Sequence, residues 1–197
     1  MIPAWYLVLV GLIAVDRLVE MAYSRHNQRA MSERGARKVR DPAFMGMVLL
    51  HAGYLCAAPL EVALLSRPFL PWLGYPALAV LAGANMLRVW AIRSLSLHWN
   101  MQIVASQSLG PVATGPYRWI RHPNYVAVFF EVPALPLVHT AWITAVTATL
   151  VHTLLLKRRI AAEERVLMSD PVYRARMGEK PRFVPATMLA FLRGIVN

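Results

Sequence analysis

The apolar pattern of this chain breaks at residues 115–125, where the sequence reads GPYRWIRHPNY. The glycine–proline pairs at 110–111 and 115–116 are strong turn signals. The chain as a whole is 57% hydrophobic, and 16% of its residues are charged, whereas about a quarter are charged in a soluble domain. We therefore expect a structured polar insert between membrane-spanning helices.

Apolar runs of spanning length predict the helices on either side of this insert. Three runs precede it, at about residues 3–23, 43–65 and 72–92. The run from 124 to about 157 is too long for one span of about 20 residues. Prolines such as Pro133 indicate that it forms two helices joined by a turn near 137–141. Residues 160–178 are expected to continue as a polar helix with a break at Asp170-Pro171.

These spans predict an all-α, polytopic integral membrane protein with about five transmembrane helices and a cytoplasmic C-terminal cofactor pocket. We expect a single domain over residues 1–197. Within it, residues 1–92 would supply three spans, and residues 93–197 would form the cofactor-binding region with a helical hairpin and a C-terminal helix.

Basic residues gather on one side of this topology. The net charge is +11, and nearly every Lys and Arg falls in a polar loop predicted at 24–42, in the insert, or in the tail. The positive-inside rule places these segments in the cytoplasm and the N-terminus outside. Such a charge would suggest nucleic acid in a soluble protein, but contact with anionic lipid explains the same residues. We expect membrane lipids and no nucleic acid as partners, and the oligomeric state is not predicted.

Charged residues also occur inside the predicted spans. Asp16 and Glu20 are four residues apart, so they share one helix face, which we expect to turn inward or to reach the interface. Arg88 lies near the cytoplasmic end of the third span, where it either snorkels to the surface or extends into the site.

Opposite charges flank the insert. Arg118, Arg121 and His122 lie where the fourth span begins, and helix N-termini favour anionic groups. Glu163 and Glu164 follow the last span and suit an ammonium group or ribose hydroxyls. A zwitterionic, ribose-bearing ligand such as S-adenosylmethionine needs both poles close together, although a charged cytoplasmic surface explains the residues equally well. The histidines show no metal-binding spacing, so no metal site is predicted.

The stretch at 115–125, combined with the Glu163-Glu164 pair at this spacing, resembles the isoprenylcysteine carboxyl methyltransferase family over roughly residues 85–185. The resemblance implies an integral-membrane, S-adenosyl-L-methionine-dependent methyltransferase whose lipophilic small-molecule substrate enters from the bilayer. By motif position it implies cofactor contacts from Tyr117, Arg121, His122, Pro123, Tyr125, Glu163 and Glu164, with His98 and Asn100 from the preceding polar segment.

Within this family, the run RHPNYV at 121–126 with Glu131 and Pro133 resembles a bacterial subgroup similar to alkylpyrone or alkylresorcinol O-methyltransferases. This implies a bacterial cytoplasmic membrane and a polyketide-type pyrone or phenol hydroxyl as the acceptor, with a prenylcysteine-like carboxylate as the alternative. The sequence is also compatible with a phospholipid or amine N-methyltransferase and with a non-enzymatic small membrane protein.

Glu131 and Arg121 are the candidate catalytic residues. A phenol with a pKa near 10 would benefit from a base, and burial raises the pKa of a carboxyl group toward neutrality. Glu131 is therefore the candidate base. The alternative is that Glu131 only pairs with Arg88 or Arg121.

Overall fold

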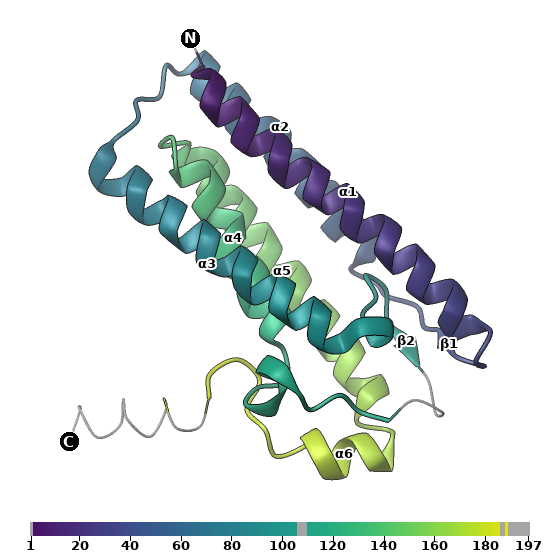
Figure 1. The fold of residues 1–197 in the computed structure, drawn as a ribbon. Helices are drawn as coiled ribbons and strands as arrows, with labels where there is room; N and C mark the ends of the chain where they lie inside the picture. Colours follow the sequence, from purple (N-terminus) through teal and green to yellow (C-terminus); the bar gives the residue numbers. More distant parts are fainter. Residues whose placement is uncertain (1, 106–109, 186–187, 189–197) are drawn as a thin grey trace.

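The computed structural model describes residues 2–105, 110–185 and 188. The described chain is a bundle of antiparallel α-helices (Figure 1). The elements in chain order are α1 Ala4–Ser32, β1 Arg37–Lys38, α2 Phe44–Leu64, α3 Pro71–Leu95, the 3₁₀ turn η1 Ser96–His98, β2 Val104–Ala105, the 3₁₀ turn η2 Gly115–Arg118, α4 Pro123–Leu137, α5 Trp142–Leu167 and α6 Pro171–Met177. The all-α prediction is confirmed, and the paired strands β1 and β2 are two residues each.

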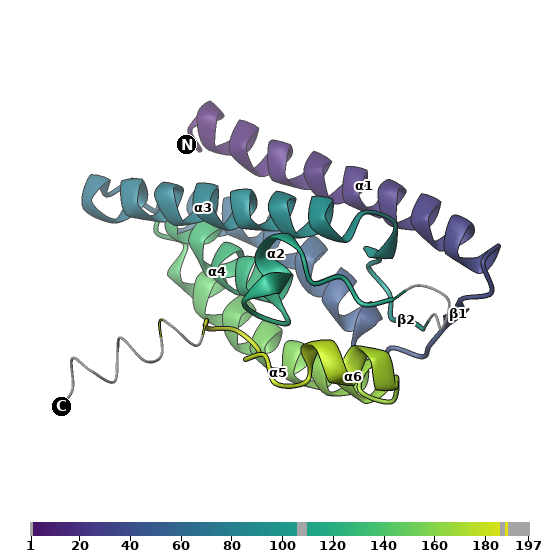
Figure 2. The ribbon, with the colours of Figure 1, turned by 60° about the horizontal axis from the view of Figure 1, so that its bottom comes forward.

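Helix α4 packs between α3 and α5, and α2 packs against α5 and α1. The N-terminus and the α2–α3 and α4–α5 connections lie at one end of the bundle (Figure 1). The strands, η2 and α6 lie at the other end, and a second view shows the same separation (Figure 2). The polar insert and the residues after α5 are therefore brought together at one end.

The predicted helical hairpin is confirmed. Helix α4 ends at Leu137 and α5 begins at Trp142. The Thr140 side chain links this turn to the α2–α3 connection by donating a 2.6 Å hydrogen bond to the carbonyl of Pro68. The predicted break at Asp170-Pro171 is also confirmed. Helix α5 ends at Leu167, and Asp170 caps α6 by accepting a hydrogen bond from the Val172 N–H.

The polar loop predicted at 24–42 is wrong over nearly its first half, because α1 continues to Ser32. The buried residues of α1 recur every three or four positions along the whole helix: Tyr6, Val10, Ile13, Arg17, Glu20, Ser24, Asn27 and Met31. From Arg17 to Asn27 the stripe is polar but keeps the helical period. The second half of α1 is too polar to be recognised by its hydropathy, but the spacing of its buried residues still predicts a helix.

About five spans were predicted, and two helices of the described chain satisfy length and hydropathy criteria for crossing a membrane. These are Phe44–Leu64 and the continuous stretch Pro71–His98. Helix α1 carries Asp16, Arg17 and Glu20 within its length, and α4 has only 15 residues. The apolar tail patch expected at 186–192 lies almost wholly outside the described residues.

Candidate active site

The turn that leads into α4 depends on Gly115. Its φ is +55°, a left-handed conformation that favours glycine. A Cβ at this position would lie 2.0 Å from Oγ of Ser94 and 3.1 Å from Nε1 of Trp90. Helix α3 therefore approaches the η2 backbone closely, and this contact fixes the position of the residues that follow.

Glu164 is the acceptor at the centre of a buried polar cluster. Its Oε1 lies 3.0 Å from Nε2 of His122 and 3.3 Å from a terminal nitrogen of Arg121. Arg182 donates to both carboxylate oxygens, at 3.1 and 2.6 Å. The α4 start, α5 and the tail segment are thus held together by one carboxylate.

The backbone at the start of α4 is occupied by the chain itself. The N–H groups of Arg121 and His122 donate to the carbonyls of Pro181 and Arg182, both at 3.0 Å. These two N–H groups are therefore not free to bind a ligand anion. A returning segment of the same chain satisfies them, which local sequence does not reveal.

Glu163 belongs to a second cluster, on the other side of His122. The Tyr125 hydroxyl donates a 2.5 Å hydrogen bond to Glu163 and accepts one from Nε of Arg159 at 2.8 Å. Arg159 also pairs with Asp41 and donates to the Met101 carbonyl at 2.5 Å. Arg159 thus connects α5 to the insert and to the segment before α2.

The end of α1, predicted to be loop, anchors the insert. The Asn27 amide donates to the carbonyls of Ser96 and Trp99, at 3.0 and 2.7 Å. The Ser24 hydroxyl accepts from the Met101 N–H at 2.9 Å. These bonds position the segment that carries His98 and Asn100.

A cavity of about 880 Å³ connects this end of the molecule with the apolar gap between α1 and α2. Seven of the predicted cofactor residues line it: His98, Asn100, Tyr117, Arg121, His122, Tyr125 and Glu163. Glu164 and Pro123 lie behind this wall. The structure therefore brings the segments around 98–100 and 117–125 together with Glu163 at one cavity.

Several buried polar atoms on this wall have no hydrogen-bond partner among the described residues. They are Nε2 of His98, Oδ1 of Asn100, Oε1 of Gln102, Nε of Arg121 and Oδ1 of Asn124. Leaving such a group unpaired costs about 1–3 kcal/mol. A set of unpaired donors and acceptors around one cavity fits a polar ligand that pairs with both kinds of group.

Tyr117 contributes a protonated hydroxyl to the same wall. Burial, followed by the negative charge of Glu163, raises the pKa of Tyr117 well above its ordinary value. The Tyr117 backbone carbonyl accepts a 2.8 Å hydrogen bond from Lys180, so the tail segment also holds η2.

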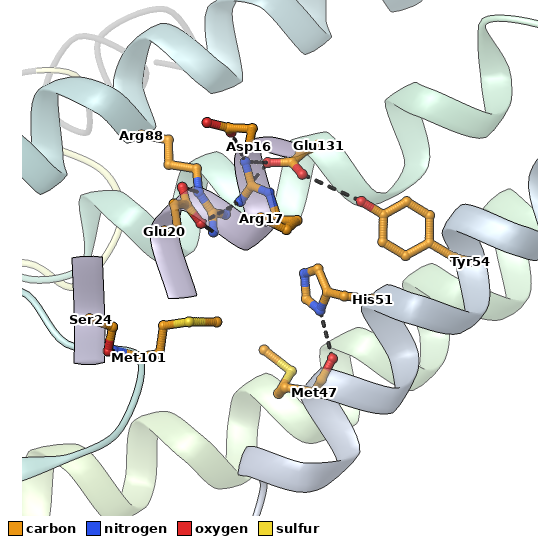
Figure 3. A network of polar contacts seen from close by, with 10 residues as sticks. All are labelled: Asp16, Arg17, Glu20, Ser24, Met47, His51, Tyr54, Arg88, Met101 and Glu131. Carbon is orange, nitrogen blue, oxygen red and sulfur yellow. Dashed lines mark hydrogen bonds and ion pairs between the residues drawn. The ribbon is translucent and has the colours of Figure 1, made fainter. Parts of the chain in front are cut away.

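Glu131 lies in a separate ion cluster, deep between the helices (Figure 3). It is fully buried, 3.5 Å from Arg88 and 3.7 Å from Arg17, and it accepts a 3.4 Å hydrogen bond from Tyr54. The predicted pairing with Arg88 is present. Glu131 does not line the cavity, whereas Arg17 and Arg88 do.

Arg88 does not snorkel to the surface, since it is buried and binds Glu20 through two nitrogens. Glu20 also accepts a 3.0 Å hydrogen bond from Arg17. Asp16 and Glu20, which were expected to share one helix face, have different environments. Glu20 is buried, whereas the side chain of Asp16 is 41% exposed and contacts Arg17.

Sequence reasoning did not identify several residues that complete the cavity. Four of them are polar or titratable: His51 of α2, Gln102 of the insert, Asn124 of α4 and Arg159 of α5. Gln102 and Asn124 are polar residues beside predicted site residues, which was the available signal. His51 stands alone in an apolar run, and its role depends on which helices face it.

Acid is expected to weaken the Glu164 cluster, which lies beyond the basic residues 157–159 that end the apolar part of α5. Burial alone would raise the pKa of Glu164, but hydrogen bonds from Arg182 and His122 and the charge of Arg121 outweigh it and hold the pKa below the ordinary 4.5. The stabilisation is therefore complete above pH 4.5 and is lost as pH falls through the folded-state pKa. We expect the difference in melting temperature between the wild type and Glu164→Gln to shrink toward zero over that range in detergent. A constant difference would contradict the assignment.

The sequence model of the isoprenylcysteine carboxyl methyltransferase family matches residues 77–169. This range contains η2, the start of α4 and both Glu163 and Glu164. An uncharacterized protein of Bacillus subtilis (strain 168), YpbQ, is 31% identical over 165 residues, which make up 83% of this chain and 97% of that protein.

A solved structure shares the fold. The eukaryotic intramembrane Ras methyltransferase ICMT (isoprenylcysteine carboxyl methyltransferase) matches with a TM-score of 0.54 and 22% identity over 75% of this chain. This chain spans 54% of the length of that enzyme's chain.

Proposed function

Because this chain belongs to the isoprenylcysteine carboxyl methyltransferase family, whose members are membrane methyltransferases, we propose that it methylates an oxygen of a lipophilic acceptor with S-adenosylmethionine. The observation that carries this proposal is the set of unpaired buried polar atoms on the wall of the 880 Å³ cavity. They lie in the segments that the family resemblance assigns to the cofactor.

The cofactor is held at the polar end of the cavity. His98, Asn100 and Arg121 offer unpaired atoms to its polar groups. Glu163 supplies negative charge. When bound, S-adenosylmethionine supplies a methyl group on a positively charged sulfur. Glu164 does not touch it directly but positions His122 and Arg121.

The acceptor enters at the opposite end. There the cavity wall is apolar and comes from Ala14 and Leu18 of α1 and from Ala52, Leu55 and Cys56 of α2. Such a wall fits a hydrocarbon chain, and a lipophilic acceptor bound there directs its polar head toward the cofactor. Within this class we favour a polyketide-type pyrone or phenol hydroxyl over a prenylcysteine-like carboxylate. The bacterial subgroup resemblance supports this choice.

The reaction suits a dry, preorganised site. An oxygen nucleophile and a sulfonium neutralise each other's charge as the bond forms, so exclusion of water assists the transfer. Holding donor and acceptor in line supplies a further part of the rate. The chain's contribution is therefore orientation, charge placement and removal of the acceptor proton where one is present.

In the membrane, α1 to α5 supply five spans of one domain over residues 1–197, with the N-terminus outside. The end that carries η2 and α6 faces the cytoplasm of a bacterial cell, beneath the inner membrane. Helices α1 and α5 both end there (Figure 1). The orientation is supported by basic residues in the C-terminal halves of these two helices, including Arg25, Arg29, Arg158 and Arg165.

A transfer assay tests the function directly. The purified protein is incubated with methyl-labelled S-adenosylmethionine and a bacterial lipid extract, and the labelled product is identified. We expect an O-methylated lipophilic product, together with calorimetric binding of S-adenosylhomocysteine. A labelled amine would identify an N-methyltransferase instead, and neither binding nor transfer would overturn the proposal.

Glu131→Gln is expected to lower kcat/KM for a phenolic and for a carboxylate acceptor by the same factor. Glu131 is fully buried behind Arg88, so it acts by positioning that guanidinium. The two acceptors are compared in steady-state assays that separate kcat from KM, and we expect KM to rise for both. A loss confined to the phenol would identify Glu131 as the base.

A further inference from the structure

We propose that His51 is the general base that takes the proton from the acceptor, and that the natural acceptor therefore carries a protonated hydroxyl, a phenol or an enol. This inference rests on the proposed function. It goes beyond it by assigning a catalytic residue in α2, outside the segment that matches the family model.

The backbone fixes the tautomer of His51. Its Nδ1 lies 2.7 Å from the carbonyl oxygen of Met47, one helical turn earlier. A carbonyl only accepts hydrogen bonds, so Nδ1 carries the hydrogen. In the neutral ring the lone pair is then on Nε2, which has no hydrogen-bond partner in the part of the chain that the structure describes.

His51 faces the cavity where its two parts meet. Figure 3 shows its ring extending from α2 into the space between the ion cluster and Met101. Met47, Met101, Arg17 and Arg88 line the cavity around it. The apolar wall begins next to His51, at Ala52 and Leu55. A hydroxyl at the head of a lipophilic acceptor bound against that wall reaches Nε2.

Charged and titratable groups face His51 from each neighbouring helix. They are Arg17 of α1, Tyr54 of α2, Arg88 of α3, Glu131 of α4, and His152 and Arg159 of α5. The carboxylate of Glu131 contacts guanidinium groups, and Tyr54 donates its hydroxyl hydrogen to Glu131. The His152 ring packs edge-on against His51 at 6.0 Å.

The rival base on the cavity wall is His98. Its Nδ1 contacts the Leu95 carbonyl at 3.2 Å and its Nε2 is unpaired, the same arrangement as in His51. His98, however, lies among the unpaired polar atoms of the cofactor end, beside Asn100 and Gln102. His51 lies beside the apolar wall, so the acceptor meets His51 first.

The step balances with His51 as the proton acceptor. The acceptor oxygen forms a bond to the methyl carbon, and the carbon–sulfur bond breaks with its electron pair left on sulfur. The proton of the hydroxyl is held at Nε2 of His51 as an imidazolium and is released to solvent after the product leaves. The guanidinium groups of Arg17 and Arg88 favour the negative charge that develops on the oxygen.

The test uses long-chain alkylphenols of graded acidity. For an alkylphenol with a pKa near 10, His51→Gln is expected to lower kcat by about 100-fold or more, the usual contribution of general base catalysis. For a nitro-substituted alkylphenol that is already ionised, the loss should be less than about threefold, because no proton remains to be taken. A carboxylate acceptor should behave like the nitrophenol. Raising the pH should restore part of the activity of the variant on the weakly acidic phenol.

Two histidine variants serve as comparisons. His139→Gln changes a buried histidine at the other end of the bundle, away from the cavity, and should leave the whole series unchanged. His98→Gln should weaken S-adenosylhomocysteine binding without an acidity-dependent loss. Equal loss across the series in His51→Gln, or the acidity-dependent pattern in His98→Gln, overturns the assignment.

A spectroscopic measurement needs no turnover and no variant. The nitro-substituted alkylphenol is titrated into the wild-type protein with S-adenosylhomocysteine, at a pH below the phenol's own pKa. Transfer of its proton to His51 produces the phenolate absorption band on binding, and absence of the band contradicts the proposal even where His51→Gln does not fold.

If the wild type transfers no methyl group and binds no S-adenosylhomocysteine, the proposed function itself has failed. If it transfers normally and His51→Gln matches it, only the assignment of His51 has failed.

Discussion

Replacing Arg88 with methionine is expected to lower the free energy of unfolding by about 3–5 kcal/mol, the usual cost of removing one partner from a buried ion pair. Arg88 is 5% exposed and binds Glu20 through two nitrogens, while a third contact reaches Glu131 at 3.5 Å. Without Arg88, two buried carboxylates share only Arg17. The remaining negative charge lies deep in the bundle, where it is poorly solvated.

Unfolding of the detergent-solubilised protein by heat or denaturant measures this effect. Arg93→Met is the matched control, because Arg93 is a less buried arginine on the same helix. It should change stability by less than about 0.5 kcal/mol. Adding Glu20→Gln to Arg88→Met should recover part of the loss, since it removes one unpaired charge. Equal stability of the two arginine variants would show that the ion cluster is not needed for folding.

Replacing Glu164 with alanine is expected to weaken S-adenosylhomocysteine binding by about 10- to 100-fold. A hydrogen bond to a charged group contributes about 1.5–3 kcal/mol, and Glu164 fixes both His122 and Arg121, whose side chains line the cavity. The alanine variant leaves Arg182 without its carboxylate as well. Calorimetric titration in detergent measures the change.

Glu179→Ala is the control for this experiment, because Glu179 is an exposed carboxylate in the same tail segment. Its affinity should match the wild type. Arg121→Ala should weaken binding by at least a similar factor, since Nε of Arg121 is one of the unpaired atoms on the cavity wall. Wild-type affinity in Glu164→Ala and Arg121→Ala together would remove this cluster from the cofactor site.

Local sequence patterns were sufficient for most of the fold. Apolar runs located α2 and α3 to within one to three residues, and prolines with the turn at 137–141 separated α4 from α5. The error in α1 came from relying on hydropathy. Ser24 and Asn27 keep the helical spacing of the buried stripe but are polar, because they bond to the insert and not to apolar neighbours.

Turns, apolar spans and motif spacing are local properties of the chain, so they predicted the helices, the polar insert and the residue types of the site. Which charges meet depends on how the helices pack. In the folded protein Glu164 pairs with Arg182, and tail carbonyls accept hydrogen bonds from the N–H groups just before α4. Glu131 contacts Arg88 and does not line the cavity. Helix packing also places His51, an isolated histidine in an apolar run, at the point where the polar and apolar parts of the cavity meet. These contacts join helices far apart in the sequence, and the packing that creates them is not encoded in any single segment.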